Sequence, residues 1–153
     1  YAQFREWDYQ NQLEWFMLDF PMHSKMQKFV RELNRLYLSS PQLWEIDDSW
    51  DGFKWLEADR AEDNAVIYER IDALGKSYTV IVHFSPVQRK SYEFPVDRPG
   101  KYRVVLNSDL EEFGGSSFLK DELITVCEGE KKGSYMLCFD LPGYCGLILE
   151  RIE

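Results

Sequence analysis

The stretch MHSKMQKFVRELNRLYL, residues 22–38, decides how the rest of the sequence is interpreted. Its apolar residues recur at steps of three and four, which places them on one face of an α-helix. The sequence therefore predicts an amphipathic helix over 22–38. Its apolar face is wide, so we expect it to cover a large surface, much of which lies outside this chain. The members of that face are Met22, Met26, Phe29, Val30, Leu33, Leu36 and Tyr37.

From Gly52 onwards, the apolar residues follow the two-residue period of β-strands. Segment 78–84, YTVIVHF, is almost wholly apolar and rich in β-branched residues, which predicts a central strand covered on both faces. Pro95 predicts that its strand lies at a sheet edge. About eight short strands at regular spacing indicate a mainly β fold, an antiparallel β-sandwich or barrel. These strands are 53–58, 65–71, 78–84, 92–96, 102–106, 123–127, 135–141 and 144–152.

The composition changes near Gly52, so we divide the chain into a helical lead, 1–51, and an all-β domain, 52–153. The net charge of −9 argues against a nucleic-acid partner, which needs a basic surface, but not against neutral sugars. No run of 18 apolar residues is present, so we expect no membrane span. No signal peptide stands at the front, and the start at Tyr1 suggests a fragment.

The cysteines and histidines do not form the pattern of a metal or nucleophile site. Cys127, Cys138 and Cys145 cannot all pair with one another, and each lies in an apolar strand context. We interpret them as three reduced thiols of a cytosolic protein. His23 and His83 lie far apart, and no Cys/His ligand spacing occurs. We therefore expect no metal site and no cysteine nucleophile in this chain.

Several ordered motifs run through the whole sequence. They are QFREW (3–7), LEW (13–15), FVRELN (29–34), GFKW (52–55), HFSPV (83–87), PGKY (99–102), LNSD (106–109) and GGS (114–116). In this order they resemble the end of the catalytic barrel and the following domain of 1,4-α-glucan branching enzymes, in the α-amylase-like superfamily. One departure is Ala2, which stands where the family usually has a glycine.

The resemblance implies that residues 1–51 are the end of a (β/α)8 barrel, with the 22–38 helix as its last helix. Residues 52–153 then correspond to the C-terminal β-sandwich. Such enzymes make α-1,6 branches in glycogen by a retaining reaction of three carboxylates, without a cofactor. All three carboxylates belong to earlier parts of the barrel. We therefore expect this chain alone to be inactive, with the missing catalytic barrel as its partner and α-glucan as the substrate of the whole enzyme.

Four residues near the start are the candidates for lining the glucan cleft: Arg5, Glu6, Trp7 and Asp8. Loops after barrel strands build such sites, and an aromatic ring beside polar groups suits a sugar. The alternative is structural: Trp7 packs, and Arg5 forms an ion pair with Glu6 or Asp8. Asp8 and Glu14 match no catalytic motif of the family, and we interpret both as solvated or ion-paired.

Two other functions stay open from the sequence. One is a free-standing, non-catalytic carbohydrate-binding β-sandwich, with surface aromatics such as Tyr92 or Phe113 as candidate binding residues. The other is a plain interaction domain. The helix 22–38 favours the fragment interpretation, because a self-contained module needs no wide apolar helix in front of it. If that face has lost its partner, we also expect the chain to associate with itself through residues 22–38.

Overall fold

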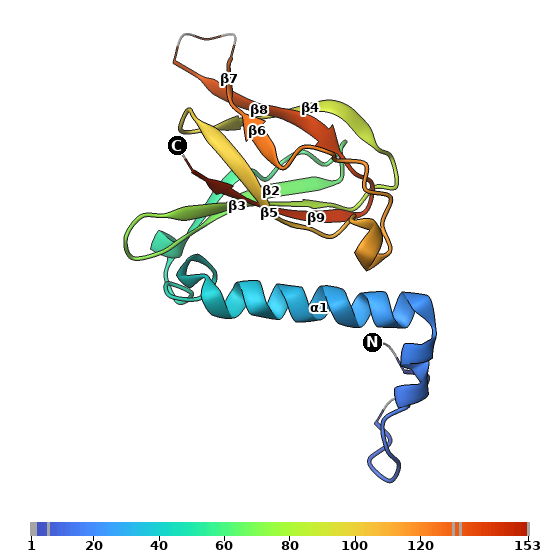
Figure 1. Ribbon diagram of the computed structural model, residues 1–153. Helices are drawn as coiled ribbons and strands as arrows, with labels where there is room; N and C mark the ends of the chain where they lie inside the picture. The colour runs from blue at the N-terminus through green and yellow to red at the C-terminus, as the bar shows by residue number, and fades with distance from the viewer. Residues whose placement is uncertain (1–2, 6, 130, 132, 153) are drawn as a thin grey trace.

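The computed structural model describes residues 3–5, 7–129, 131 and 133–152. Within them, one α-helix and several short 3-10 turns accompany nine strands, which confirms the mainly β fold (Figure 1). The helical elements are η1 (Trp15–Asp19), α1 (Pro21–Ser39), η2 (Pro41–Leu43), η3 (Trp50–Gly52) and η4 (Glu111–Phe113). The strands are β1 (Phe53–Glu57), β2 (Ala65–Ile71), β3 (Ser77–His83), β4 (Arg89–Val96), β5 (Lys101–Asn107), β6 (Leu123–Thr125), β7 (Cys127–Glu128), β8 (Tyr135–Leu141) and β9 (Cys145–Arg151).

Helix α1 confirms the helix predicted over 22–38, with one residue more at each end. Pro21 occupies its first turn, where the missing N–H of proline costs nothing. Ser40 leaves helical geometry, with φ −122° and ψ 93°, because Pro41 follows it. Two prolines therefore set both ends of the helix.

The strands form two antiparallel sheets. The larger has the order β1-β2-β3-β9-β5-β6, and the smaller has the order β4-β8-β7. Strand β3 lies inside the larger sheet with most of its side chains buried, as its apolar sequence predicts. Strand β4 carries Pro95 and lies at the edge of the smaller sheet, as predicted, because proline has no N–H to give a second neighbour.

The strand predicted over 123–127 is in fact two strands in different sheets. Residues Leu123–Thr125 pair with β5, whereas Cys127 and Glu128 pair with β8. Between them, the amide of Val126 donates to the carbonyl of Gly100 at 3.0 Å. The chain thus crosses from one sheet to the other over a single residue, which apolar patterning alone does not indicate.

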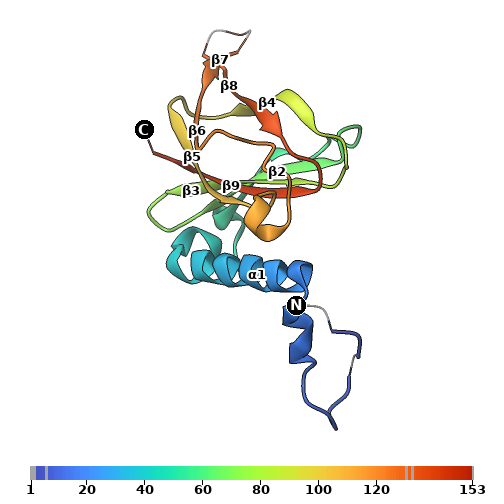
Figure 2. The same cartoon turned by 45° about the vertical axis from the view of Figure 1, so that its right-hand side comes forward.

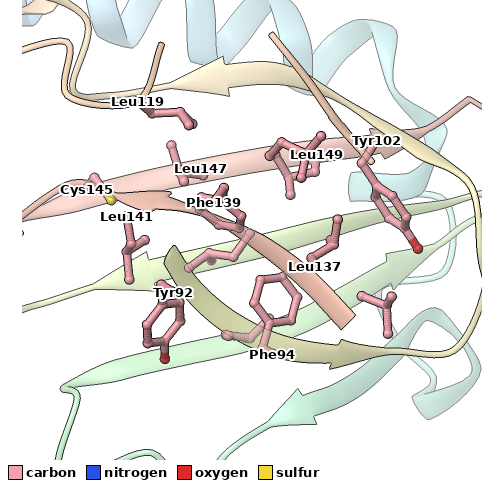
Figure 3. Packing of buried hydrophobic residues seen from close by; sticks show 14 residues of the cluster. Tyr92, Phe94, Tyr102, Leu119, Leu137, Phe139, Leu141, Cys145, Leu147 and Leu149 are labelled. Carbon is pink, nitrogen blue, oxygen red and sulfur yellow. The ribbon is translucent and has the colours of Figure 1, made fainter. Parts of the chain in front are cut away.

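The main core lies between the two sheets (Figure 3). Leu147 and Leu149 of β9 face Leu137 and Phe139 of β8 across the sandwich, and all four are almost fully buried. Phe94 meets Phe139 edge to face, with 6.0 Å between the ring centroids. Burying one such side chain contributes roughly 1.5–3 kcal/mol, so this layer dominates the stability of the β-domain.

A second, smaller core joins α1 to the outer face of the larger sheet (Figure 1). Phe29, Leu33 and Leu36 pack there against a sheet surface that includes Val80 and Ile148. Hydrogen bonds and one ring contact fix both ends of the helix. Near its end, Ser40 and Tyr78 share a buried hydrogen bond of 3.1 Å between their hydroxyls. Near its start, Lys25 Nζ donates to the Glu111 carbonyl, and the Phe29 and Phe113 rings meet at 5.5 Å.

The helix nevertheless has no fully buried residue. Met26, Val30 and Tyr37, which we call the outer face of α1, are 41–49% exposed. The segment before the helix also presents large exposed apolar side chains, among them Phe16 and Phe20. That segment extends away from the β-domain, so it adds to the bare surface instead of covering it (Figures 1 and 2).

Candidate functional site

The segment before η1 holds the residues predicted to line a glucan cleft. Arg5 lies between two carboxylates, with 3.6 Å from Nη1 to Asp8 and 3.9 Å from Nε to Glu14. Glu14 also accepts the backbone amide of Phe4 at 2.8 Å. Glu6 lies outside the described residues. The ion pair between Arg5 and Asp8 agrees with the structural alternative, in which Arg5 holds the loop together.

Trp7 stands apart from this group. Its side chain is 96% exposed, and its backbone adopts a left-handed φ of 59°, which is uncommon for a bulky residue. The structure therefore brings Arg5, Asp8 and Glu14 together and points Trp7 into solvent. A fully exposed ring of this kind is free to contact a ligand or another part of a larger protein.

Asp8 is electrostatically unsuited to act as a general acid. A side-chain hydrogen bond from Asn11, backbone amides and the charge of Arg5 lower its pKa below the ordinary value, against the opposing effect of burial. Asn11 Nδ2 donates to its Oδ2 at 2.9 Å. The general acid of a glycosidase needs the opposite, a raised pKa. Asp8 is thus suited to accept hydroxyl hydrogen bonds, not to protonate a leaving oxygen.

A cysteine and a histidine face each other in the described β-domain, but they do not form a nucleophile site. Cys145 pairs with His83 across β3 and β9, and both are buried. The Cys145 thiol and the His83 Nδ1 both contact the carbonyl of Pro142, at 3.2 and 2.7 Å. Burial, with the charge of Asp109, raises the pKa of Cys145 to about 12, so the thiol stays protonated and inert.

All three cysteines are free thiols, as predicted, although Cys127 is exposed instead of packed. Across the described residues, no group of three or more His, Cys, Asp or Glu side chains could hold a metal ion. Helix α1 lacks the apolar length needed to cross a bilayer, and no other described helix has it.

The two aromatics named as sugar-binding candidates do not present free rings. Tyr92 is only 6% exposed, and the Arg60 guanidinium covers its ring at 5.2 Å from the centroid. Phe113 is half-buried against Phe29 of the helix. The expectation of surface aromatics at these positions is therefore wrong. Both rings are used in packing.

A different set of rings does reach the surface, at the start of the β-domain. We call Trp50, Phe53, Trp55 and Tyr68 the outer aromatic cluster. Phe53 stacks on Tyr68 at 5.2 Å with 25° between the planes, and it meets Trp55 edge-on at 4.9 Å. Trp50 meets Phe53 at 6.1 Å. Trp50 is 82% exposed and Trp55 is 49% exposed, so the packed inner rings hold the outer two in position.

The chemistry of this cluster suits a sugar ring. A rigid aromatic face stacks on the apolar face of a pyranose, and nearby carboxylates can accept hydrogen bonds from its hydroxyls. Asp48 and Asp51 flank Trp50 and are exposed. The sequence pattern assigns Phe53 and Trp55 to a strand and to the GFKW motif, and neither assignment indicates that their rings form a surface cluster. The missed signal was Trp50, which precedes the strand and adds a third ring to the same face.

Comparisons with known proteins place these features in a family context. The model of the "Alpha amylase, C-terminal all-beta domain" matches residues 55–152, which include every strand after β1. The β-sandwich described above is thus the fold that this family model represents.

Individual relatives extend the similarity into the helical lead. The chain is 40% identical to the 1,4-alpha-glucan branching enzyme GlgB of Halothermothrix orenii over 84% of its length, and 38% identical to that of Photobacterium profundum over 92%. It is 34% identical to the enzyme of Salinibacter ruber over its whole length. The matched regions are 20%, 20% and 24% of those proteins. The chain therefore spans about a fifth of the length of the curated relatives it matches.

Proposed function

This chain belongs to the family of the alpha amylase C-terminal all-beta domain, and from that membership and its branching-enzyme relatives we propose that it serves as the C-terminal part of a larger, cytoplasmic 1,4-α-glucan branching enzyme. In this role residues 52–153 form the β-domain, and residues 1–51 dock that domain onto a catalytic barrel. The observation that carries the proposal is the outer face of α1. Three apolar side chains there are 41–49% exposed, although the helix also packs on the sheet.

An apolar surface of this kind is unfavourable in water, and the preceding segment adds Phe16 and Phe20, which are 55% and 52% exposed. Contiguous exposed apolar surface of more than a few hundred Å² usually marks an interface. Two basic residues of the helix contact the β-domain instead: Lys25 donates to the Glu111 carbonyl of η4, and Lys28 contacts Glu112 at 2.6 Å. The helix thus has one side for its own β-domain and a second side for a partner.

The whole enzyme would cleave an α-1,4 bond by attack of a carboxylate on the anomeric carbon. A second carboxyl would protonate the leaving oxygen. The 6-hydroxyl of another glucan would then take the glycosyl group, with no cofactor. Arg5, Trp7 and Asp8 would line the cleft and orient glucan, and Glu6 belongs to the same motif. The lowered pKa of Asp8 does not suit acid catalysis. The family resemblance implies that the catalytic carboxylates belong to earlier parts of the barrel.

The test is complementation. The 153-residue chain and the rest of the longer protein are expressed separately, mixed, and assayed for branching of amylose by the fall in iodine absorbance. We expect no branching from this chain alone, and co-purification plus activity after mixing. Replacing Met26 and Val30 together by lysine should abolish co-purification. The matched control, Arg31→Ala on the polar side of the helix, should not.

Two results would refute the docking role. One is branching activity of the 153-residue chain by itself. The other is unchanged co-purification of the Met26→Lys, Val30→Lys double variant, with far-ultraviolet circular dichroism showing that it is folded.

The outer aromatic cluster favours a second function, glucan binding without catalysis. Two largely exposed tryptophans, held by two packed rings, form a ready surface for a sugar chain. Native electrophoresis in gels containing amylopectin tests this directly. We expect Trp50→Ala and Trp55→Ala to lose retardation, whereas Tyr144→Ala, at an aromatic residue that is 69% exposed outside the cluster, keeps it. Equal mobility with and without amylopectin for the unaltered chain would exclude this function.

A further inference from the structure

A pocket of about 380 Å³ lies at the end of the sandwich where β9 finishes. The turn between β2 and β3, the connection from β4 to β5 and the last residues of β9 meet there, and both ribbon views show these three segments at the same end of the sandwich (Figures 1 and 2). The charged side chains that line it are Lys76, Arg98, Arg103, Arg151 and Glu150. The pocket thus has four basic groups and one acidic group, in a chain whose net charge is −9. Such a local excess of positive charge attracts anions.

Three of these cations stand at positions that local contacts constrain. Lys76 ends the turn between β2 and β3, and the side chain of Asp72, which is buried, accepts its amide at 2.8 Å. Arg151 donates from Nε to the carbonyl of Pro99 at 2.9 Å. Arg98 directly precedes that proline, which restricts its backbone. Charged groups that are already positioned bind a ligand at a lower entropic cost.

Most of this positive charge is not neutralised by the protein itself. Arg103 forms an ion pair with Glu150, which lies opposite it across β5 and β9. Within the described part of the chain, the other three cations have no carboxylate partner: Lys76, Arg98 and Arg151. Burial raises the pKa of Tyr102, and the charges of Arg151 and Arg98 oppose that rise, so both guanidinium groups act on the same hydroxyl. Like charges that converge in this way repel, and an anion between them relieves the repulsion.

The remaining lining residues indicate which anion fits. They are Gln42, Gly75, Ser77 and Ile152. No aromatic ring is among the lining residues that the structure describes, so a nucleotide base would have nothing to stack on. Guanidinium groups match phosphate oxygens with two N–H donors each. The volume lies near the lower end of the range of roughly 300–1,000 Å³ for small-molecule sites, so a polar body has room beside a phosphate group.

We propose that this pocket binds a small sugar phosphate, whose phosphate lies among Lys76, Arg98 and Arg151. The sugar hydroxyls lie beside Ser77 and Glu150. Because the cations converge from separate segments, they suit a compact anion and not an extended acidic chain. No member of the outer face of α1 or of the outer aromatic cluster lines the pocket. The site therefore depends neither on docking to a barrel nor on glucan binding.

Isothermal titration calorimetry of the 153-residue chain with ribose 5-phosphate tests the proposal, with ribose as the uncharged comparison. We expect saturable binding of ribose 5-phosphate and none of ribose. The affinity should fall as NaCl is added, because salt screens contacts between exposed charges. Lys76→Ala and Arg98→Ala should each weaken binding about fivefold, the effect of one unit charge at an exposed contact. Arg98→Lys keeps the charge and should therefore lose less.

Lys90→Ala is the matched control. It removes the same charge from an exposed lysine of β4 that does not line the pocket, and it should bind ribose 5-phosphate like the unaltered chain. Unchanged affinity in both Lys76→Ala and Arg98→Ala, when circular dichroism shows them folded, would overturn the proposal. An equal loss in Lys90→Ala would overturn it too, since net charge alone would then explain the binding.

The longer protein should bind ribose 5-phosphate with the same affinity as the 153-residue chain. Absence of binding in both proteins would contradict the proposal. Binding by the 153-residue chain alone would also contradict it, because another part of the longer protein would then occupy the pocket.

Discussion

Asp109 offers the sharpest test of how the β-domain holds the helix. Its carboxylate is buried in the turn after β5, with 7% of the residue exposed. It accepts the amides of Ser116 and Phe118, both at 2.8 Å, and the Ser116 hydroxyl at 3.1 Å. The loop that it closes carries η4, which contacts α1 through Glu111 and Phe113. Removing this carboxylate should loosen the loop and the start of the helix together.

The expected cost of Asp109→Ala follows from those contacts. Hydrogen bonds to a charged group contribute roughly 1.5–3 kcal/mol each, and the substitution leaves two amides without their acceptor. We therefore expect a loss of about 4 kcal/mol in the free energy of unfolding. In a domain of about 150 residues, each kcal/mol lowers Tm by roughly 2–4 °C, so the midpoint should fall by about 12 °C.

Urea unfolding monitored by tryptophan fluorescence measures this loss, and thermal circular dichroism gives the Tm. Asp109→Asn is the matched control. It keeps the shape and one acceptor oxygen, so it should lose about half as much. A loss below about 1 kcal/mol in Asp109→Ala would show that the loop is held by other contacts, and it would refute this account of how η4 and α1 are anchored.

Four further predictions concern individual residues. Gly115→Ala should prevent stable folding, measured by circular dichroism, because a Cβ there would lie 2.2 Å from the Asp109 carbonyl oxygen. Val30→Lys should reduce self-association of the chain, measured by sedimentation velocity; a monomer at high concentration for the unaltered chain would contradict this. Cys127 should react with iodoacetamide in the folded chain, whereas Cys145 should react only after unfolding. Burial raises the pKa of Cys145 from 9.0 to about 12. The unfolded chain therefore loses this proton at a lower pH than the folded chain, so the free energy of unfolding should fall as the pH rises through that interval. Urea titrations should show a smaller fall for Cys145→Ala.

The fold was largely predictable because local patterning and burial agree through most of the chain. The three- and four-residue steps of 22–38 reflect real packing of Phe29 and Leu33, and the apolar run of 78–83 reflects two covered faces, although Phe84 at its end is exposed. The division of 123–127 was not predictable. Thr125 and Cys127 have no local feature that assigns them to different sheets, since that depends on pairing with distant β5 and β8.

The candidate sites were less predictable than the fold. The exposure of Trp7 and the burial of Tyr92 depend on tertiary packing, which residue type alone does not reveal. An aromatic residue in a strand gives the same sequence pattern whether its ring packs inside, like that of Tyr92, or belongs to a surface cluster, like that of Trp55. Whether Arg5 and Asp8 contact glucan stays a prediction.

The crossing at Val126 has a mechanical consequence. A sandwich whose layers are joined only by long loops can shear, with one layer sliding over the other. Here a single residue separates Thr125 in one layer from Cys127 in the other, so sliding must first break backbone pairing on both sides. The two layers are therefore expected to open as one cooperative unit, and their slowest amide protons to exchange with solvent at a common rate.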